Sequence, residues 1–167
     1  MQEKKVILHK ENIAIKLNRL SYEIAETTSD TADLVIIGIR ENGFKIAEKM
    51  ADLLKSLLTN NIILVGLSLN KSNPDIVSLD TVIDFNNKNV LLVDDVCNSG
   101  KTLLYALKPL LNSHPKKIEV LVLVDRMYKQ FPVKPNFVGL SVATTLSDFI
   151  EVIVENDEIK EAVLISK

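Results

Sequence analysis

Apolar runs of strand length alternate with amphipathic stretches of helix length along most of this 167-residue chain. The apolar runs are DLVIIG from Asp33, NIILVGLSL from Asn61, NVLLVDD from Asn89 and KIEVLVLVD from Lys117. Unbroken apolar runs of this kind are typical of strands buried on both faces of a parallel sheet. The periodicity elsewhere predicts helices over residues 9–28, 43–58 and 99–112. Strand and helix in this alternation predict an α/β fold, with right-handed crossovers onto a parallel sheet and helices on both faces.

The pattern changes after Asp125. A loop with two prolines, RMYKQFPVKP, is followed by the short β-like runs NFVGLSVA, FIEVIVE and EAVLIS, with no helical stretch between them. We expect this C-terminal part to form a small cap over the edge of the sheet. Because no internal repeat or linker divides the chain, residues 1–167 are interpreted as a single domain.

Composition excludes several classes of protein. A formal net charge of -2 argues against a protein built mainly to coat nucleic acid. The single cysteine excludes an internal disulfide framework and fits a reducing compartment. The opening residues MQEKKVILHK contain no apolar core of signal-peptide length, and no run reaches the ~20 apolar residues of a membrane span. We therefore expect a cytoplasmic protein without a membrane partner.

The stretch Val90–Leu103, VLLVDDVCNSGKTL, carries the most chemistry. It ends like a nucleotide-triphosphatase P-loop, but that motif requires glycine where Asp95 stands, so the P-loop reading fails. What remains is a strand, two carboxylates, a small-residue loop and a helix start that favours an anion. Carboxylates accept hydrogen bonds from sugar hydroxyls and attract hydrated magnesium. A ribose that bears a 5-phosphate and a magnesium-bound pyrophosphate meets both requirements.

Three loops are expected at the carboxyl ends of the predicted strands. They are GIRENG (38–43), DDVCNSGKT (94–102) and DRMYKQ (125–130). Ligands of open parallel sheets bind beyond the carboxyl ends of the strands, so these loops should converge on one site.

These residues resemble a known family. VLLVDDVCNSGKTL looks like the signature of type I phosphoribosyltransferases, which bind phosphoribosyl pyrophosphate (PRPP). GIRENG stands where that family has its pyrophosphate loop, and LVLVDRMYKQFPVKPNFVGLSVAT resembles the branch of bifunctional pyrimidine-operon attenuators and uracil phosphoribosyltransferases. The similarity extends from about residue 9 to the C-terminus. It implies a Rossmann-like parallel sheet with a small C-terminal or hood element.

The resemblance also implies roles for individual residues. Asp94 and Asp95 would bind the ribose hydroxyls, and magnesium would be held near them through PRPP and water, with no direct protein ligand. Arg40 would join them as a catalytic residue by facing the pyrophosphate. The loop around the 5-phosphate would comprise Val96, Cys97, Asn98, Ser99, Gly100, Lys101 and Thr102. The pyrophosphate loop would comprise Ile39, Arg40, Glu41, Asn42 and Gly43, and the base would meet Arg126, Phe137 and Val138. A homodimer or higher homo-oligomer is also implied.

Two departures from the branch leave its activity open. Glu41 and Asn42 reduce the positive charge of a loop that is usually basic. The segment NKSNPDIVSLDTVID (70–84) is shorter than the branch's flexible hood loop and lacks its Arg-Asp-Asp pattern. The chain could therefore be an active enzyme, or a regulator that senses nucleotides and binds RNA with little turnover. The lysines available for RNA are Lys116, Lys117, Lys129 and Lys134, which otherwise form an ordinary solvated face.

The base is predicted from Asn98. The 6-oxopurine branch typically has an aspartate at this position to accept the purine N7 proton, and an amide cannot act as that base. The sequence therefore favours uracil over hypoxanthine and guanine. A purine enzyme stays the alternative, because a carboxylate such as Asp148 could replace the missing base. For Phe137, a place in the core is the more common role of such a residue, and base stacking is the alternative.

Overall fold

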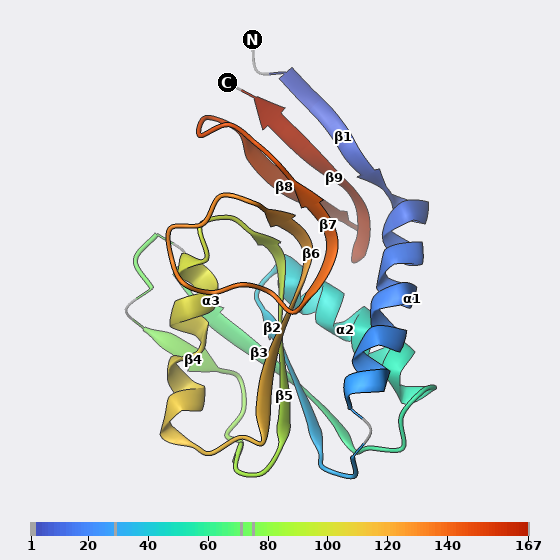
Figure 1. Cartoon of the computed structure of the whole chain (residues 1–167), viewed down its shortest axis with the longest axis vertical. Coiled ribbons are helices and arrows are strands. Elements are labelled where there is room, and N and C mark those ends of the chain that lie inside the picture. Colours follow the sequence, from blue (N-terminus) through green and yellow to red (C-terminus); the bar gives the residue numbers. More distant parts are fainter. Residues whose placement is uncertain (1–2, 29, 71, 75, 167) are drawn as a thin grey trace.

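The computed structural model describes residues 3–28, 30–70, 72–74 and 76–166 (Figure 1). Its elements, in chain order, are β1 (Glu3–His9), α1 (Lys10–Thr27), β2 (Leu34–Ile39), α2 (Asn42–Lys55), β3 (Ile62–Leu69), β4 (Val77–Leu79), β5 (Asn89–Cys97), α3 (Lys101–Ala106), η1 (Lys108–Asn112), β6 (Lys117–Arg126), β7 (Phe137–Val142), β8 (Phe149–Glu155) and β9 (Glu158–Ser166).

The main sheet has six strands in the order β4-β3-β2-β5-β6-β7. All neighbouring pairs are parallel except β3 and β4, which are antiparallel. Every residue of β2 and of β5 is buried, as expected for strands covered on both faces. The predicted α/β fold with a parallel sheet is confirmed.

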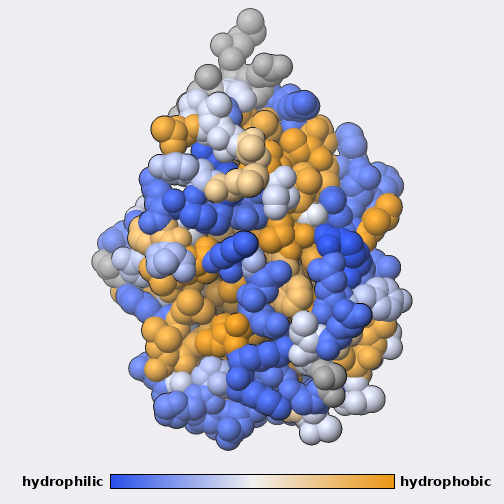
Figure 2. Space-filling view, in the orientation of Figure 1, coloured by the Kyte–Doolittle hydropathy of each residue, from blue (hydrophilic) through white to orange (hydrophobic). Residues whose placement is uncertain are grey.

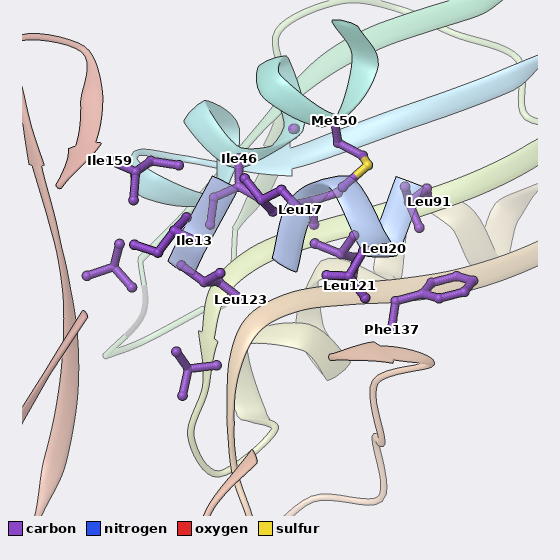
Figure 3. Close-up of a cluster of buried hydrophobic side chains, with 14 of the residues drawn as sticks. Ile13, Leu17, Leu20, Ile46, Met50, Leu91, Leu121, Leu123, Phe137 and Ile159 are labelled. Atoms are coloured by element: carbon purple, nitrogen blue, oxygen red, sulfur yellow. The ribbon is translucent and has the colours of Figure 1, made fainter. Parts of the chain in front are cut away.

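Alternate residues of the central strands build two cores. Ile36 and Leu91 belong to the core shared with α1 and α2, whereas Ile37 and Leu92 belong to the core shared with α3 and η1. Figure 3 shows the first core, where α1 and α2 side chains meet those of the sheet. Helices therefore cover both faces, and the carboxyl ends of the strands are left for the loops.

Two predicted helices are shorter than their sequence pattern. The second ends at Lys55 rather than at residue 58. The third is split into α3 and the 3-10 helix η1, which contains Pro109 near its start. Proline has no backbone N–H and its ring clashes with the carbonyl four residues earlier, so an α-helix does not continue through this position.

The C-terminal part differs from the predicted cap in one respect. β7 pairs in parallel with β6 and is the sixth strand of the main sheet. The remaining strands β8 and β9 pair with β1, and the order β1-β9-β8 defines a separate antiparallel sheet, here called the hood sheet. Figure 1 shows the hood sheet above the carboxyl ends of the main strands. The expected hood element is thus present, with the N-terminal strand β1 as a member that the sequence pattern did not identify.

The surface in Figure 2 mixes hydrophilic and hydrophobic residues on the visible face, without one continuous apolar band. Among the described residues, no helix has the length and apolar character required to cross a membrane.

Candidate functional site

The site is a cleft between the end of β5 and the hood sheet. Residues 94–103 line one side of the cleft, and residues 150–152 of β8 line the other. The first group contains the acidic pair and the small-residue loop predicted from sequence. The contribution of β8 was not predicted, because nothing in the sequence shows where a cap packs.

The acidic pair lies at the end of the fully buried strand β5. Asp94 is 1% exposed and Asp95 is 8% exposed, although both line the cleft. The backbone N–H of Asp95 donates to Asp94 Oδ1 at 2.9 Å, and the N–H of Val96 donates to Asp95 Oδ1 at 2.8 Å. These local bonds hold both carboxylates in a defined orientation.

The loop after the acidic pair turns sharply at Gly100. This glycine has a φ of +86°, and a Cβ there would come within 3.2 Å of the Phe131 carbonyl oxygen. The N–H groups of Gln130 and Phe131 both donate to the Ser99 carbonyl at 3.0 Å. The segment after β6 therefore packs against the turn and holds it through these hydrogen bonds. At Gly100 only glycine fits without strain.

The predicted pyrophosphate loop follows β2, and Arg40 in it does not face the acidic pair. Its guanidinium NH2 forms an ion pair with Asp80 Oδ2 at 2.6 Å, on the side of β3 and β4. The Arg40 Cζ lies 4.3 Å from the centroid of the Phe44 ring. The peptide bond between Arg40 and Glu41 is cis. The Arg40 guanidinium is thus held by the Asp80 carboxylate, a pairing that the sequence did not predict.

The end of the same loop packs directly on the acidic pair. A Cβ on Gly43 would lie 2.9 Å from the Asp94 Cα, so α2 begins in close contact with β5. The Asn42 Nδ2 donates to Asp95 Oδ2 at 3.0 Å and to the Val152 carbonyl at 2.9 Å. Two of the three predicted loops therefore meet at Asp95.

The third loop, after β6, reaches the same end of the sheet. Asp125 pairs with Cys97 across β5 and β6, and the Lys129 Nζ forms an ion pair with Asp125 Oδ1 at 2.5 Å. The buried position of Cys97 raises the pKa of its thiol to about 11, so the thiol is protonated at neutral pH. Arg126 donates to the Thr144 hydroxyl and to the Thr145 carbonyl, each at 2.5 Å. The segments after β2 and β6 therefore contact the loop after β5, whereas the cleft itself is lined by residues 94–103 and 150–152. Arg126 is bonded to the β7–β8 connection.

Phe137 and Val138 lie away from this end. They start β7, where Phe137 pairs with Leu121, five residues before the end of β6. The Phe137 side chain is 6% exposed and belongs to the core shown in Figure 3. The Val138 carbonyl accepts a hydrogen bond from the Arg19 guanidinium at 2.9 Å. The ring therefore offers no stacking face to a base in the cleft, and its core reading is the one that the structure supports.

The residues of the cleft fit a magnesium ion that is bound through a ligand and water. Paired carboxylates supply the hard oxygen atoms that magnesium prefers. Among the described residues, no group of three or more His, Cys, Asp or Glu side chains is placed to hold a metal ion.

Comparison with known proteins gives a consistent family. Residues 4–158 match the model of the phosphoribosyl transferase domain. The chain is 34% identical over 161 residues to the bifunctional protein PyrR of Latilactobacillus sakei subsp. sakei (strain 23K), covering 89% of this chain and 90% of that protein. It is 30% identical over 168 residues to the bifunctional protein PyrR of Leuconostoc citreum (strain KM20), covering 95% and 96%.

Solved structures share the fold. The hypoxanthine phosphoribosyltransferase of Trypanosoma cruzi superposes with a TM-score of 0.79 at 18% identity, covering 96% of this chain and 95% of that chain. A hypoxanthine-guanine phosphoribosyltransferase of Bacillus anthracis str. 'Ames Ancestor' gives a TM-score of 0.70 at 23% identity, covering 89% and 87%. At these identities the likeness concerns architecture.

Proposed function

The chain belongs to the phosphoribosyl transferase domain family and is a phosphoribosyltransferase, and on this premise we propose that it transfers the phosphoribosyl group of PRPP to uracil, giving uridine monophosphate (UMP) and pyrophosphate. The observation that carries the proposal is the cleft itself, which combines the acidic pair with the loop 97–102 under one strand of the hood sheet.

Different residues of the cleft bind different parts of PRPP. Asp94 and Asp95 accept hydrogen bonds from the ribose hydroxyls, and the fixed orientation of both carboxylates supports this role. The backbone N–H groups of residues 97–102, with the Ser99 and Thr102 hydroxyls, hold the 5-phosphate. When bound, magnesium neutralises charge on the pyrophosphate oxygens.

Catalysis is mainly a matter of positioning and electrostatics. As the bond from C1 to pyrophosphate breaks, C1 of the ribose becomes cationic and negative charge grows on the leaving group. The bond from C1 to N1 of uracil forms, and the N1 proton passes to water or to the departing pyrophosphate. The acidic pair fixes the sugar, and the loop fixes the 5-phosphate, so C1 is held at a set distance from the incoming ring nitrogen. The hood sheet covers one side of the cleft and limits the access of water to C1.

The preference for uracil is supported by the residues that could act as a base. Asn98 lines the cleft and cannot accept a proton from a purine ring. The backbone N–H of Thr145 donates to Asp148 Oδ2 at 2.8 Å and, together with the Thr145 hydroxyl and Ser166, lowers the pKa of Asp148. A carboxylate with a lowered pKa is a weaker base, so Asp148 is a poor replacement for the purine-branch aspartate.

Turnover with defined bases tests the assignment. The protein is incubated with PRPP, magnesium and radiolabelled uracil, hypoxanthine or guanine, and the labelled nucleotide is separated from the base. We expect UMP from uracil and no product from the purines. Inosine or guanosine monophosphate as the main product would refute uracil while leaving the PRPP site intact.

A second candidate function is regulation by nucleotide binding, and the Arg40–Asp80 ion pair favours it. In this contact the Arg40 guanidinium is paired with a carboxylate of the protein instead of a ligand. UMP has no pyrophosphate, so its binding does not require this guanidinium. The name bifunctional protein, carried by the PyrR relatives, supports a second activity besides transfer. UMP binding without detectable turnover would identify this function.

RNA would be the partner of such a regulator, but the predicted lysines give it limited support. Lys116 pairs with Asp30 at 2.8 Å, and Lys117 pairs with Glu119 at 2.9 Å. Lys129 pairs with Asp125. Lys134 is exposed and remains the best candidate of the four for a phosphate contact. Filter binding of RNA at increasing salt, with Lys134→Gln beside the wild type, tests this contact through the slope of affinity against salt.

A further inference from the structure

Asn42 connects three parts of the site through one side-chain amide. It is the first residue of α2, and its Nδ2 donates both to Asp95 Oδ2 and to the Val152 carbonyl. A primary amide nitrogen carries two hydrogens, so each of the two bonds uses one of them. The pyrophosphate loop, the acidic pair and the hood sheet therefore meet at a single group.

The bond to Asp95 completes the orientation of that carboxylate. Oδ1 accepts from the Val96 N–H at 2.8 Å, and Oδ2 accepts from Asn42 at 3.0 Å. With a donor on each oxygen, the plane of the carboxylate is fixed by the protein itself. Each carboxylate oxygen can accept more than one hydrogen bond, so a ribose hydroxyl can be added to this arrangement. A group oriented in advance binds its ligand at a smaller entropic cost.

The bond to Val152 fastens the hood sheet. β8 is an edge strand of that sheet, and the Val152 side chain is 3% exposed in the core that the hood sheet shares with the main sheet. Its carbonyl accepts a hydrogen bond from the Asn42 amide at 2.9 Å. The same Asn42 amide therefore fixes the orientation of the Asp95 carboxylate and the position of the strand β8, which faces that carboxylate across the cleft.

We infer that Asn42 is a positioning residue that couples the ribose-binding carboxylate Asp95 to the hood sheet. The inference rests on the proposed function in placing ribose hydroxyls at Asp95, but not on the identity of the base. An amide is neutral, so its contribution is orientation and not attraction of the pyrophosphate. It should then serve PRPP and UMP alike, because both ligands present the same two hydroxyls.

The direct test compares three ligands on two variants. Calorimetry measures the binding of PRPP with magnesium, of UMP, and of pyrophosphate with magnesium to the wild type, Asn42→Ala and Asn60→Ala. Asn60 is a matched control, because its Nδ2 also donates to two carbonyls, those of Asp30 and Ala32 at 2.8 and 2.7 Å, away from the cleft. We expect Asn42→Ala to weaken PRPP and UMP by a similar factor, about tenfold, and to leave pyrophosphate binding unchanged. Asn60→Ala should change none of the three affinities.

Hydrogen exchange gives an independent readout of the coupling. Bound ligand should slow amide exchange in β8 of the wild type and of Asn60→Ala, but not in Asn42→Ala. Asn42→Asp adds a pH signature, because two carboxylates in contact share a proton more readily than either alone. Its ligand affinity should be lost at neutral pH and partly restored as the pH falls, which loss of packing alone would not produce.

Three results would overturn the inference. Unchanged PRPP and UMP affinity in Asn42→Ala would show that this amide does not position Asp95. Weaker binding of PRPP and pyrophosphate with normal UMP binding would show a direct pyrophosphate contact by Asn42. An equal loss of affinity in Asn60→Ala would show general destabilisation. If the wild type binds PRPP but not UMP, the uracil assignment fails. The inference about Asn42 is still supported in that case if Asn42→Ala loses affinity for PRPP but keeps its affinity for pyrophosphate.

Discussion

The guanidinium of Arg40 lies 2.6 Å from the carboxylate of Asp80, and this ion pair holds the cation of the pyrophosphate loop on the side of β3 and β4. Both side chains are about two-fifths exposed, at 40% and 41%. Exposed pairs of this kind contribute about 0.2–1 kcal/mol, so a highly charged ligand can compete for the arginine.

Removal of Asp80 should therefore increase the affinity for PRPP. We expect Asp80→Asn to strengthen PRPP binding severalfold, because Arg40 no longer has to leave a carboxylate, and to leave UMP binding unchanged. Calorimetry with both ligands measures the effect. Asp52→Asn is the control, since Asp52 pairs with Lys55 at 3.1 Å in a more exposed ion pair on α2. Unchanged PRPP affinity in Asp80→Asn would mean that Arg40 does not reach the pyrophosphate.

The acidic pair should be required for ligand binding more than for folding. Asparagine keeps an oxygen that can accept the N–H bonds now made to Asp94 and Asp95. Hydrogen bonds to a charged group contribute about 1.5–3 kcal/mol each, so the double variant Asp94→Asn/Asp95→Asn should lose at least about a hundredfold in PRPP affinity. Calorimetry with PRPP and magnesium measures this loss, and circular dichroism confirms the fold. Affinity like that of the wild type would refute the assignment of the pair.

A side chain at Gly100 should disturb the phosphate loop in two ways. Valine is disfavoured at a φ of +86°, and its Cβ would crowd the Phe131 carbonyl. We expect Gly100→Val to weaken UMP binding by about tenfold or more, which is about 1.4 kcal/mol. Gly100→Asn is the companion variant, because asparagine tolerates positive φ, and it should retain more affinity. Normal UMP binding by a folded Gly100→Val protein would exclude this loop as the phosphate cradle.

Stability should fall in acid through Asp30, at the end of the sheet opposite the cleft. The Lys116 ammonium at 2.8 Å, the Ala32 N–H and the Asn89 amide lower the pKa of Asp30 from 3.8 to about 2. Because the folded pKa lies below the unfolded value, the stabilisation is present above about pH 4 and is lost as the pH falls towards 2.

Urea denaturation between pH 5 and pH 2.5 measures this loss. The unfolding midpoint of the wild type should fall more steeply with acid than that of Asp30→Asn. Some decline should persist in the variant, because Lys10 and Lys160 also lower the pKa of Glu158 to about 2. Parallel curves for the two proteins would contradict the role of Asp30.

The central strands and the acidic cleft were accessible from sequence because their signals are local. The runs around Val35 and Leu91 are apolar without interruption, and burial on both faces leaves no other place for them. The turn at Gly100 is likewise predicted by residues that are adjacent in the sequence. Family resemblance supplied the roles of these residues, which spacing alone did not.

Three features were not located from the sequence: the place of the Phe137 ring, the partner of Arg40 and the strand β1. All three depend on contacts between distant segments. The sequence around Phe137 looks the same whether its ring enters the core or meets a base, and only the register with Leu121 decides. The partner of Arg40 is 40 residues away in a segment with no regular pattern. The strand β1 could not be recognised because its pairing partner lies near the other end of the chain.

That last pairing also fixes when the site can be completed during synthesis. β9 is the middle strand of the hood sheet, and both β1 and β8 pair with it. While residues 158–166 are still inside the ribosome, β1 lacks this neighbour and β8 cannot be held in place over the acidic pair. The nascent protein can therefore form its main sheet early, but it should become able to retain a nucleotide only after β9 has emerged.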